Sequence, residues 1–97
     1  MELTQQHINT IRHFFSGLPV KKAYLFGSYS RNEADENSDV DILVELDHTK
    51  PIGIQFFTYG DELQNLLKKK VDIVSDEGVS KYVKPYIDKD KVLIYER

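Results

Sequence analysis

Asp39 and Asp41 are the residues of this chain whose spacing most clearly indicates chemistry. They lie one residue apart at the start of an alternating run, residues 39–46, and this alternation is the period of a β-strand. Residues i and i+2 of a strand share a face and have Cα atoms roughly 6.5 Å apart. The two carboxylates therefore point the same way, while Val40 and Ile42 are expected to anchor the opposite face in the core.

A third aspartate, Asp72, lies inside the short β-branched run 71–74. If this strand lies beside residues 39–46, Asp72 can join the other two carboxylates. Three carboxylates within ~5 Å of one another repel by roughly 3 kcal/mol per pair at an effective dielectric constant near 20, and a divalent cation would reverse that sign. Ligands that are all oxygen favour magnesium or manganese over zinc.

A Gly-Ser pair, Gly27 and Ser28, directly follows the apolar run 23–26, which reads as a buried strand. A glycine at this point allows a sharp turn and a close backbone approach to a ligand. A short helical turn is expected to start here, and helix starts attract phosphate. Arg31 would add positive charge or tie the turn to the sheet. Ser30 and Glu33 also fit a capping box, which would start the helix two residues later.

Each of these features also has a purely structural interpretation. Asp39 would cap a turn while Asp41 faces water, and Asp72 would be an edge-strand charge that limits aggregation. The Gly-Ser pair would be ordinary punctuation after a strand, and Arg31 would form a structural salt bridge. The combined spacing of all of them favours a site for phosphate and metal.

The composition predicts a single domain over residues 1–97. The chain is 40% apolar and 30% charged, which is typical of a soluble globular protein. It has no cysteine, which excludes disulfides and thiolate metal sites. No apolar run reaches membrane length and residues 1–20 lack a signal-peptide layout, so we expect no membrane contact and a cytoplasmic location. The net charge of −3 argues against general nucleic-acid binding.

The elements expected from periodicity and turn residues are helices and strands in alternation. Helices are predicted over residues 4–17, 55–69 and 81–88, strands over 22–26, 39–46 and 71–74, and a short apolar segment over 92–95. The second helix is expected to turn its apolar residues mostly inward, namely Phe56, Phe57, Leu63, Leu66 and Leu67. The fold class is therefore α/β (α+β), a small mixed β-sheet with helices packed mainly on one face and the carboxylates on the open side.

The stretch 27–44, with Asp72 downstream, resembles the minimal nucleotidyltransferase (MNT) family of the DNA polymerase beta-like superfamily. That family is marked by G-S, about ten residues and D-x-D, and here residues 29–38 supply the ten. Two positions depart from the family pattern: its alanine is Ser30, and its glycine after the arginine is Asn32. Asparagine is the next best residue for a left-handed turn, so the backbone should be kept.

The resemblance implies a nucleotidyltransferase fold and a magnesium-dependent transfer of AMP. Gly27 and Ser28 would hold the phosphates of ATP, with Arg31 as a further binding residue. Asp39 and Asp41 would bind two magnesium ions about 3.5–4 Å apart. Asp72 would bind the ion nearer the acceptor and help to deprotonate its hydroxyl.

The resemblance also implies a partner. MNT domains are commonly paired with a helical HEPT-type toxin, and several act as antitoxins that transfer AMP to a tyrosine of that toxin, so a hetero-oligomer is expected. The main alternative is a catalytically silent binding module that neutralises the partner sterically. Transfer to a small molecule, as in aminoglycoside nucleotidyltransferases, is disfavoured because the added helical domain of those enzymes is missing here. A nucleic-acid acceptor is disfavoured by the acidic balance.

Overall fold

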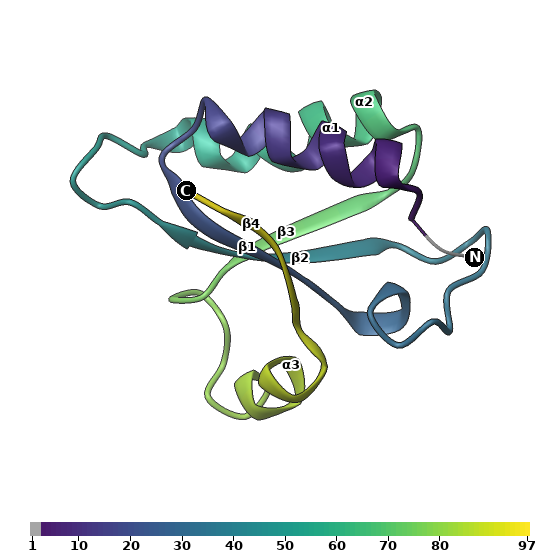
Figure 1. The fold of residues 1–97 in the computed structure, drawn as a ribbon. Coiled ribbons are helices and arrows are strands. Elements are labelled where there is room, and N and C mark those ends of the chain that lie inside the picture. The colour runs from purple at the N-terminus through teal and green to yellow at the C-terminus, as the bar shows by residue number, and fades with distance from the viewer. Residues whose placement is uncertain (1–2) are drawn as a thin grey trace.

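The computed structural model, which describes residues 3–97, contains one four-stranded mixed sheet and three α-helices (Figure 1). The strands are β1 (Val20–Phe26), β2 (Val40–Leu46), β3 (Val71–Ser75) and β4 (Val92–Glu96), in the order β3-β2-β1-β4. β1 pairs antiparallel with both β2 and β4, whereas β2 and β3 run parallel. The predicted α+β fold with a small mixed sheet is confirmed.

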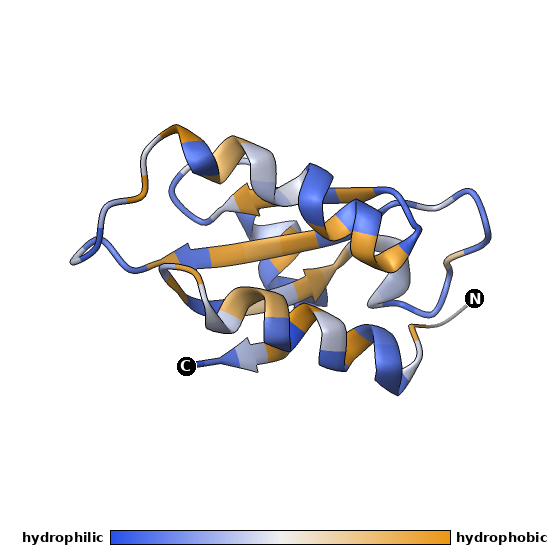
Figure 2. Ribbon diagram, turned by 90° about the horizontal axis from the view of Figure 1, so that it is seen from above, coloured by the Kyte–Doolittle hydropathy of each residue, from blue (hydrophilic) through white to orange (hydrophobic). Residues whose placement is uncertain are grey.

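Two helices, α1 (Gln5–Ser16) and α2 (Tyr59–Leu67), cover one face of the sheet, and α3 (Lys84–Asp90) lies on the other (Figure 1). α1 starts with a capping box, in which the Thr4 hydroxyl accepts from the His7 N–H and His7 Nδ1 accepts from the Thr4 N–H. In Figure 2 the strands beneath α1 and α2 are predominantly apolar. No helix within residues 3–97 has the length and apolar character that crossing a membrane would require.

The main core lies between the sheet and the pair α1 and α2. Val40, Ile42 and Val44 of β2 are fully buried there, as predicted for the apolar face of this strand. Their partners from the helices and from the neighbouring strands include Ile11, Phe15, Val20, Ala23, Leu25, Tyr59, Leu63, Leu67 and Ile94. Because side chains alternate along a strand, Asp41 lies on the opposite face, which α3 covers in part.

The predicted second helix was wrong in two respects. Residues 54–58 form a separate 3-10 helix, η2 (Ile54–Thr58), and α2 begins only at Tyr59. Phe57 is 79% exposed and Leu66 is 57% exposed, although both were expected to point inward. The change from three to 3.6 residues per turn rotates η2 out of phase with α2, so the apolar stripe is not continuous.

Other elements also differ from the expectation, in their boundaries or in their type. β2 begins at Val40, so Asp39 precedes the strand rather than belonging to it. α3 begins at Lys84 rather than residue 81, because Pro85 has no N–H and is favoured in the first turn of a helix. The apolar segment near the end of the chain is a full strand, β4, which pairs with β1.

Candidate active site

The predicted site residues meet at one edge of the sheet, where β1 ends and where β2 and β3 begin. Asp41 is opposite Phe26 in the antiparallel pair and opposite Asp72 in the parallel pair. Asp41 therefore lies between the Gly-Ser turn that follows Phe26 and the carboxylate on β3. Asp39 and Asp72 are exposed and Asp41 is half-buried.

Electrostatic repulsion between the three carboxylates affects the pKa of Asp41. Its pKa is raised to about 6, first by burial of the carboxyl and then by the negative charges of Asp72 and Asp39. Arg31 opposes this shift. A half-buried carboxyl whose charge is disfavoured by two others is suited to gain a cation.

The Gly-Ser turn is built around a conformation that favours glycine. Gly27 has a φ of 75°, and a Cβ at this position would collide with Oδ2 of Asp41. Gly27–Tyr29 form a 3-10 turn, and the Ser30 hydroxyl donates to the Gly27 carbonyl over 2.7 Å. The helical turn thus begins at Gly27, and the capping-box alternative with a later start is wrong. Asn32 has a φ of 58°, which confirms the predicted left-handed conformation.

Arg31 lies between the Gly-Ser turn and α3. Its guanidinium forms ion pairs with Glu33, at 3.0 Å, and with Asp90 of α3, at 2.6 Å. These ion pairs raise the pKa of Arg31. The structural salt bridge anticipated for Arg31 is therefore present, and contact of Arg31 with a nucleotide stays a prediction.

The carboxylates have the right chemistry for magnesium. Asp39, Asp41 and Asp72 provide only oxygen ligands, which magnesium prefers, and the backbone register brings them to one edge of the sheet. In the part of the chain that the structure describes, no three His, Asp or Glu side chains lie together as a group that could hold a metal ion. Coordination by these residues therefore stays a prediction that rests on strand register and on the raised pKa of Asp41.

Comparison with known families decides the class of protein. The family described as polymerase beta, nucleotidyltransferase matches residues 9–97. The chain belongs to this nucleotidyltransferase family. The match spans every element that positions the three aspartates and the Gly-Ser turn.

Relatives of this nucleotidyltransferase include candidate protein adenylyltransferases of Methanocaldococcus jannaschii. One is 43% identical over 76 residues, which are 77% of this chain and 76% of the relative. Another is 34% identical over 95 residues, which are 96% of this chain and 92% of the relative.

Solved structures show the same fold. A toxin-antitoxin structure with AMP-PNP superposes with a TM-score of 0.80 at 24% identity, over 93% of this chain and 73% of the other. A complex of a tri-AMPylated Shewanella oneidensis HEPN toxin with its MNT antitoxin gives a TM-score of 0.75 at 22% identity, over 98% of this chain and 74% of the other. At this identity these likenesses establish the fold.

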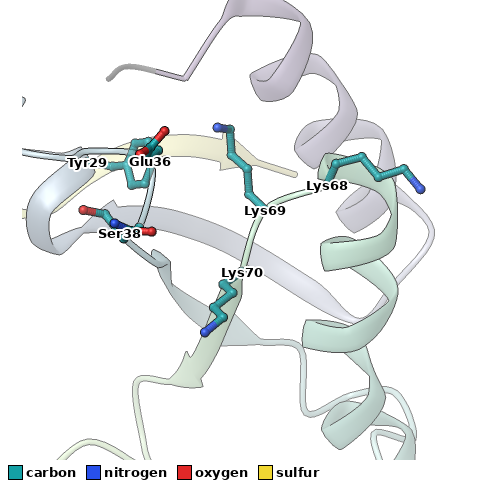
Figure 3. A pocket seen from close by; sticks show the side chains of 7 residues that line it. Tyr29, Glu36, Ser38, Lys68, Lys69 and Lys70 are labelled. Atoms are coloured by element: carbon teal, nitrogen blue, oxygen red, sulfur yellow. The ribbon is translucent and has the colours of Figure 1, made fainter.

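Sequence reasoning missed one feature beside the nucleotidyltransferase site. Three successive lysines, Lys68 to Lys70, line a cavity of about 380 Å³ together with Tyr29, Glu36, Asn37 and Ser38 (Figure 3). The signal was present in the sequence, because the lysine run directly precedes the strand that carries Asp72. It was not used, since nothing in the sequence places that strand beside β2.

Proposed function

We propose that this chain is a magnesium-dependent protein adenylyltransferase that moves AMP from ATP to a tyrosine of a HEPT-type toxin and thereby acts as its antitoxin. The observation that carries the proposal is the half-buried Asp41, with Asp72 beside it across the β2–β3 pair and Gly27 against its carboxylate. A cytoplasmic location is part of this proposal.

Each motif residue has one role in this proposal. Gly27 and Ser28 bind the phosphates of ATP, and Asp39, Asp41 and Asp72 hold magnesium. Bound magnesium would neutralise the negative charge that develops on the reacting phosphate. The tyrosine oxygen attacks the α-phosphorus and loses its proton toward Asp72. The bond between the α-phosphorus and the bridging oxygen breaks, so that pyrophosphate leaves and a tyrosine–AMP ester remains.

Support for the acceptor comes from the relatives. Two of them are named as candidate protein adenylyltransferases, and a Thermococcus cleftensis relative is named protein adenylyltransferase MntA. The similar solved structures are toxin-antitoxin complexes, one with AMP-PNP and one with an AMPylated HEPN toxin.

The decisive experiment mixes the purified chain with ATP, magnesium and a purified HEPT-type toxin, and measures the intact mass of the toxin. We expect a gain of one or more AMP units and their location on tyrosine by peptide mapping. The Asp39→Ala, Asp41→Ala double variant should transfer no AMP and should keep its circular dichroism spectrum.

Two other results would contradict the proposal. A stable complex without any mass gain would support the steric binding module instead. Continued transfer by the double variant would show that the assignment of these aspartates is wrong.

A further inference from the structure

We propose that Lys68 and Lys70 form the binding surface for an acidic segment of the acceptor protein, on the β3 side of the carboxylates. The inference rests on the proposed function, which identifies the acceptor as a tyrosine hydroxyl of a partner protein. It further specifies that the sequence around this tyrosine is rich in glutamate or aspartate.

Strand register places Lys70 beside the carboxylates. The Val40 N–H donates to the Lys70 carbonyl over 2.8 Å, and Val40 is opposite Val71 in the parallel pair. Lys70 therefore lies opposite Asp39, and it shares a face with Asp72 because the two are two residues apart in extended chain. In Figure 3 its side chain points away from Lys69.

Sheet order places Lys70, which leads into β3, on the far side of β2 from β1, although Tyr29 at the end of the Gly-Ser turn borders the same cavity as the lysines. β2, with Asp41, lies between β3 and β1, and β1 leads into the Gly-Ser turn. A triphosphate at Gly27 and Ser28 would occupy the β1 side. The β3 side, with Lys70 and Asp72, is then left for the acceptor.

The side chains of Lys68, Lys69 and Lys70 point in different directions from the turn before β3 (Figure 3). Lys68 ends α2 in a left-handed conformation, with a φ of 58°, and its N–H donates to the Gln64 carbonyl. Lys69 lies over the Tyr29 ring, 5.9 Å from its centroid. The three lysines stand between two hollows of about 380 Å³ each, one bordered by Tyr29 and the loop 36–38 and one by Gln64 and Asn65.

The charges of Lys68 and Lys70 are available to a partner. Both side chains are exposed, and no ion pair within residues 3–97 involves either of them. The chain as a whole has a net charge of −3, so this surface has the opposite sign to the rest of the molecule. Complementary charge of this kind steers encounter and selects partners.

The neighbouring groups favour a peptide over a nucleic acid. Proteins that bind single-stranded nucleic acids combine a basic groove with exposed aromatic rings on which bases stack. Tyr29, the aromatic residue of this cavity, is only 5% exposed. Glu36, Asp39 and Asp72 would repel a continuous run of phosphates, whereas a peptide can place single carboxylates on Lys68 and Lys70.

Binding can be tested without any reliance on AMP transfer. The probe is a fluorescein-labelled peptide with one tyrosine flanked on both sides by glutamates. A matched control peptide has glutamines in place of the glutamates. Kd is measured by fluorescence anisotropy for the whole chain at low and high salt. The variant is Lys68→Gln, Lys70→Gln, and the control is Lys84→Gln, Lys89→Gln, which removes the same charge from α3.

We expect the glutamate peptide to bind at least about fivefold more tightly than the glutamine peptide, which is what two exposed ion pairs provide. The Lys68→Gln, Lys70→Gln variant should lose this preference and most of the salt dependence, and the α3 control should keep both. Equal affinity for the two peptides, or an unchanged preference in the variant, would overturn the inference. Tighter binding of a labelled oligoadenylate through the same lysines would overturn it in favour of RNA.

The two proposals fail separately. If the toxin gains no AMP but the glutamate peptide binds through these lysines, the adenylyltransferase assignment is wrong and the surface remains. If AMP is transferred and the peptide preference is missing, only the surface assignment is wrong.

Discussion

At the scale of single residues, Gly27 and Asp41 are in steric contact although they belong to different halves of the motif. Gly27→Ala combines two effects: a left-handed φ of 75° for a residue with a side chain, and a collision with Oδ2 of Asp41. The first costs about 1–2 kcal/mol. We expect Gly27→Ala to lower the free energy of unfolding by more than this and to abolish AMP transfer, measured by urea denaturation and intact mass.

Gly53→Ala is the matched control for this prediction. Gly53 also has a positive φ, 56°, with a ψ of −162° that essentially only glycine adopts, but a Cβ there meets no atom within 4 Å. Gly53→Ala should therefore lower the free energy of unfolding through backbone strain and keep transfer activity. Loss of transfer in both variants would show that the contact with Asp41 is not what Gly27→Ala disturbs.

Asp41 should make the stability of the fold depend on pH. Its pKa in the folded state is raised to about 6 from an ordinary value of 3.8, so the folded state is penalised once the carboxyl ionises. Below about pH 4 the carboxyl is protonated and the folded state carries no penalty. The folded state loses stability as pH rises through about 6 and the carboxyl ionises. Asp41→Asn should raise the free energy of unfolding by about 1 kcal/mol at pH 8, since solvent screens a half-buried group, and should change it little at pH 4.

Thermal melts of wild type and Asp41→Asn across this pH range check the prediction. The variant should gain Tm over wild type between about pH 4 and pH 7. A difference in Tm that stays constant over the range would mean that Asp41 is not the group responsible.

At the scale of elements, α3 is attached to the Gly-Ser turn through the ion pair between Arg31 and Asp90. Asp90→Asn removes the charge of the α3 partner, and Glu33→Gln removes that of the other partner, which lies near the turn in sequence. We expect faster amide hydrogen exchange in α3 for Asp90→Asn and wild-type exchange for Glu33→Gln. Equal protection of α3 in both variants would show that other contacts hold this helix.

The helices and strands that could be predicted from the sequence are those marked by a pattern of residues close together along the chain. The alternation over residues 39–46 predicted β2, and the helix predicted over residues 4–17 corresponds to α1. The break before Tyr59 was missed because the apolar residues of η2 and α2 are close enough in spacing to resemble one helix. β4 was predicted only as an apolar segment, since its status as a strand depends on pairing with β1, far away in sequence.

The same distinction applies to the site. Gly27, Ser28, Asp39 and Asp41 could be predicted as site residues because their spacing is local, and Asp72 because it lies in an apolar run. The role of Lys70 depends on the parallel register between β2 and β3, which the sequence does not specify. The pairing of Arg31 with Asp90 likewise depends on where α3 docks.

At the scale of the whole molecule, an ion pair between Arg97 and Asp47 joins β4 to the end of β2. The Arg97 guanidinium also donates to the Leu18 carbonyl, and the Asp47 N–H donates to the Pro19 carbonyl. These contacts bring the start of β1, the end of β2 and the end of β4 together at the edge of the sheet away from the site.

This cluster should govern acid unfolding. The pKa of Asp47 is lowered to about 2, first by hydrogen bonds from the Thr49 hydroxyl and N–H and then by Arg97. A lowered pKa stabilises the folded state above the ordinary value of 3.8 and loses that contribution as pH falls through about 2. We expect Asp47→Asn to lower Tm at pH 5 and to show a flatter decline of Tm between about pH 4 and pH 2 than wild type.

Thr49→Val tests the order of causes, because it removes the hydroxyl and keeps the ion pair. The decline of Tm with falling pH in Thr49→Val should lie between the declines of wild type and Asp47→Asn. If Tm declines in both variants as it does in wild type, other carboxylates are responsible for acid unfolding.

The sheet order also sets when the site can assemble as the chain folds. β1 and β2 are antiparallel neighbours that follow one another in sequence, joined by residues 27–39, so Gly27 and Asp41 meet through a contact that closes early. Asp72 arrives only when α2 has crossed over and β3 docks in parallel, a pairing of higher contact order. A nascent chain released before β3 would thus contain both halves of the G-S and D-x-D motif and still lack the third carboxylate.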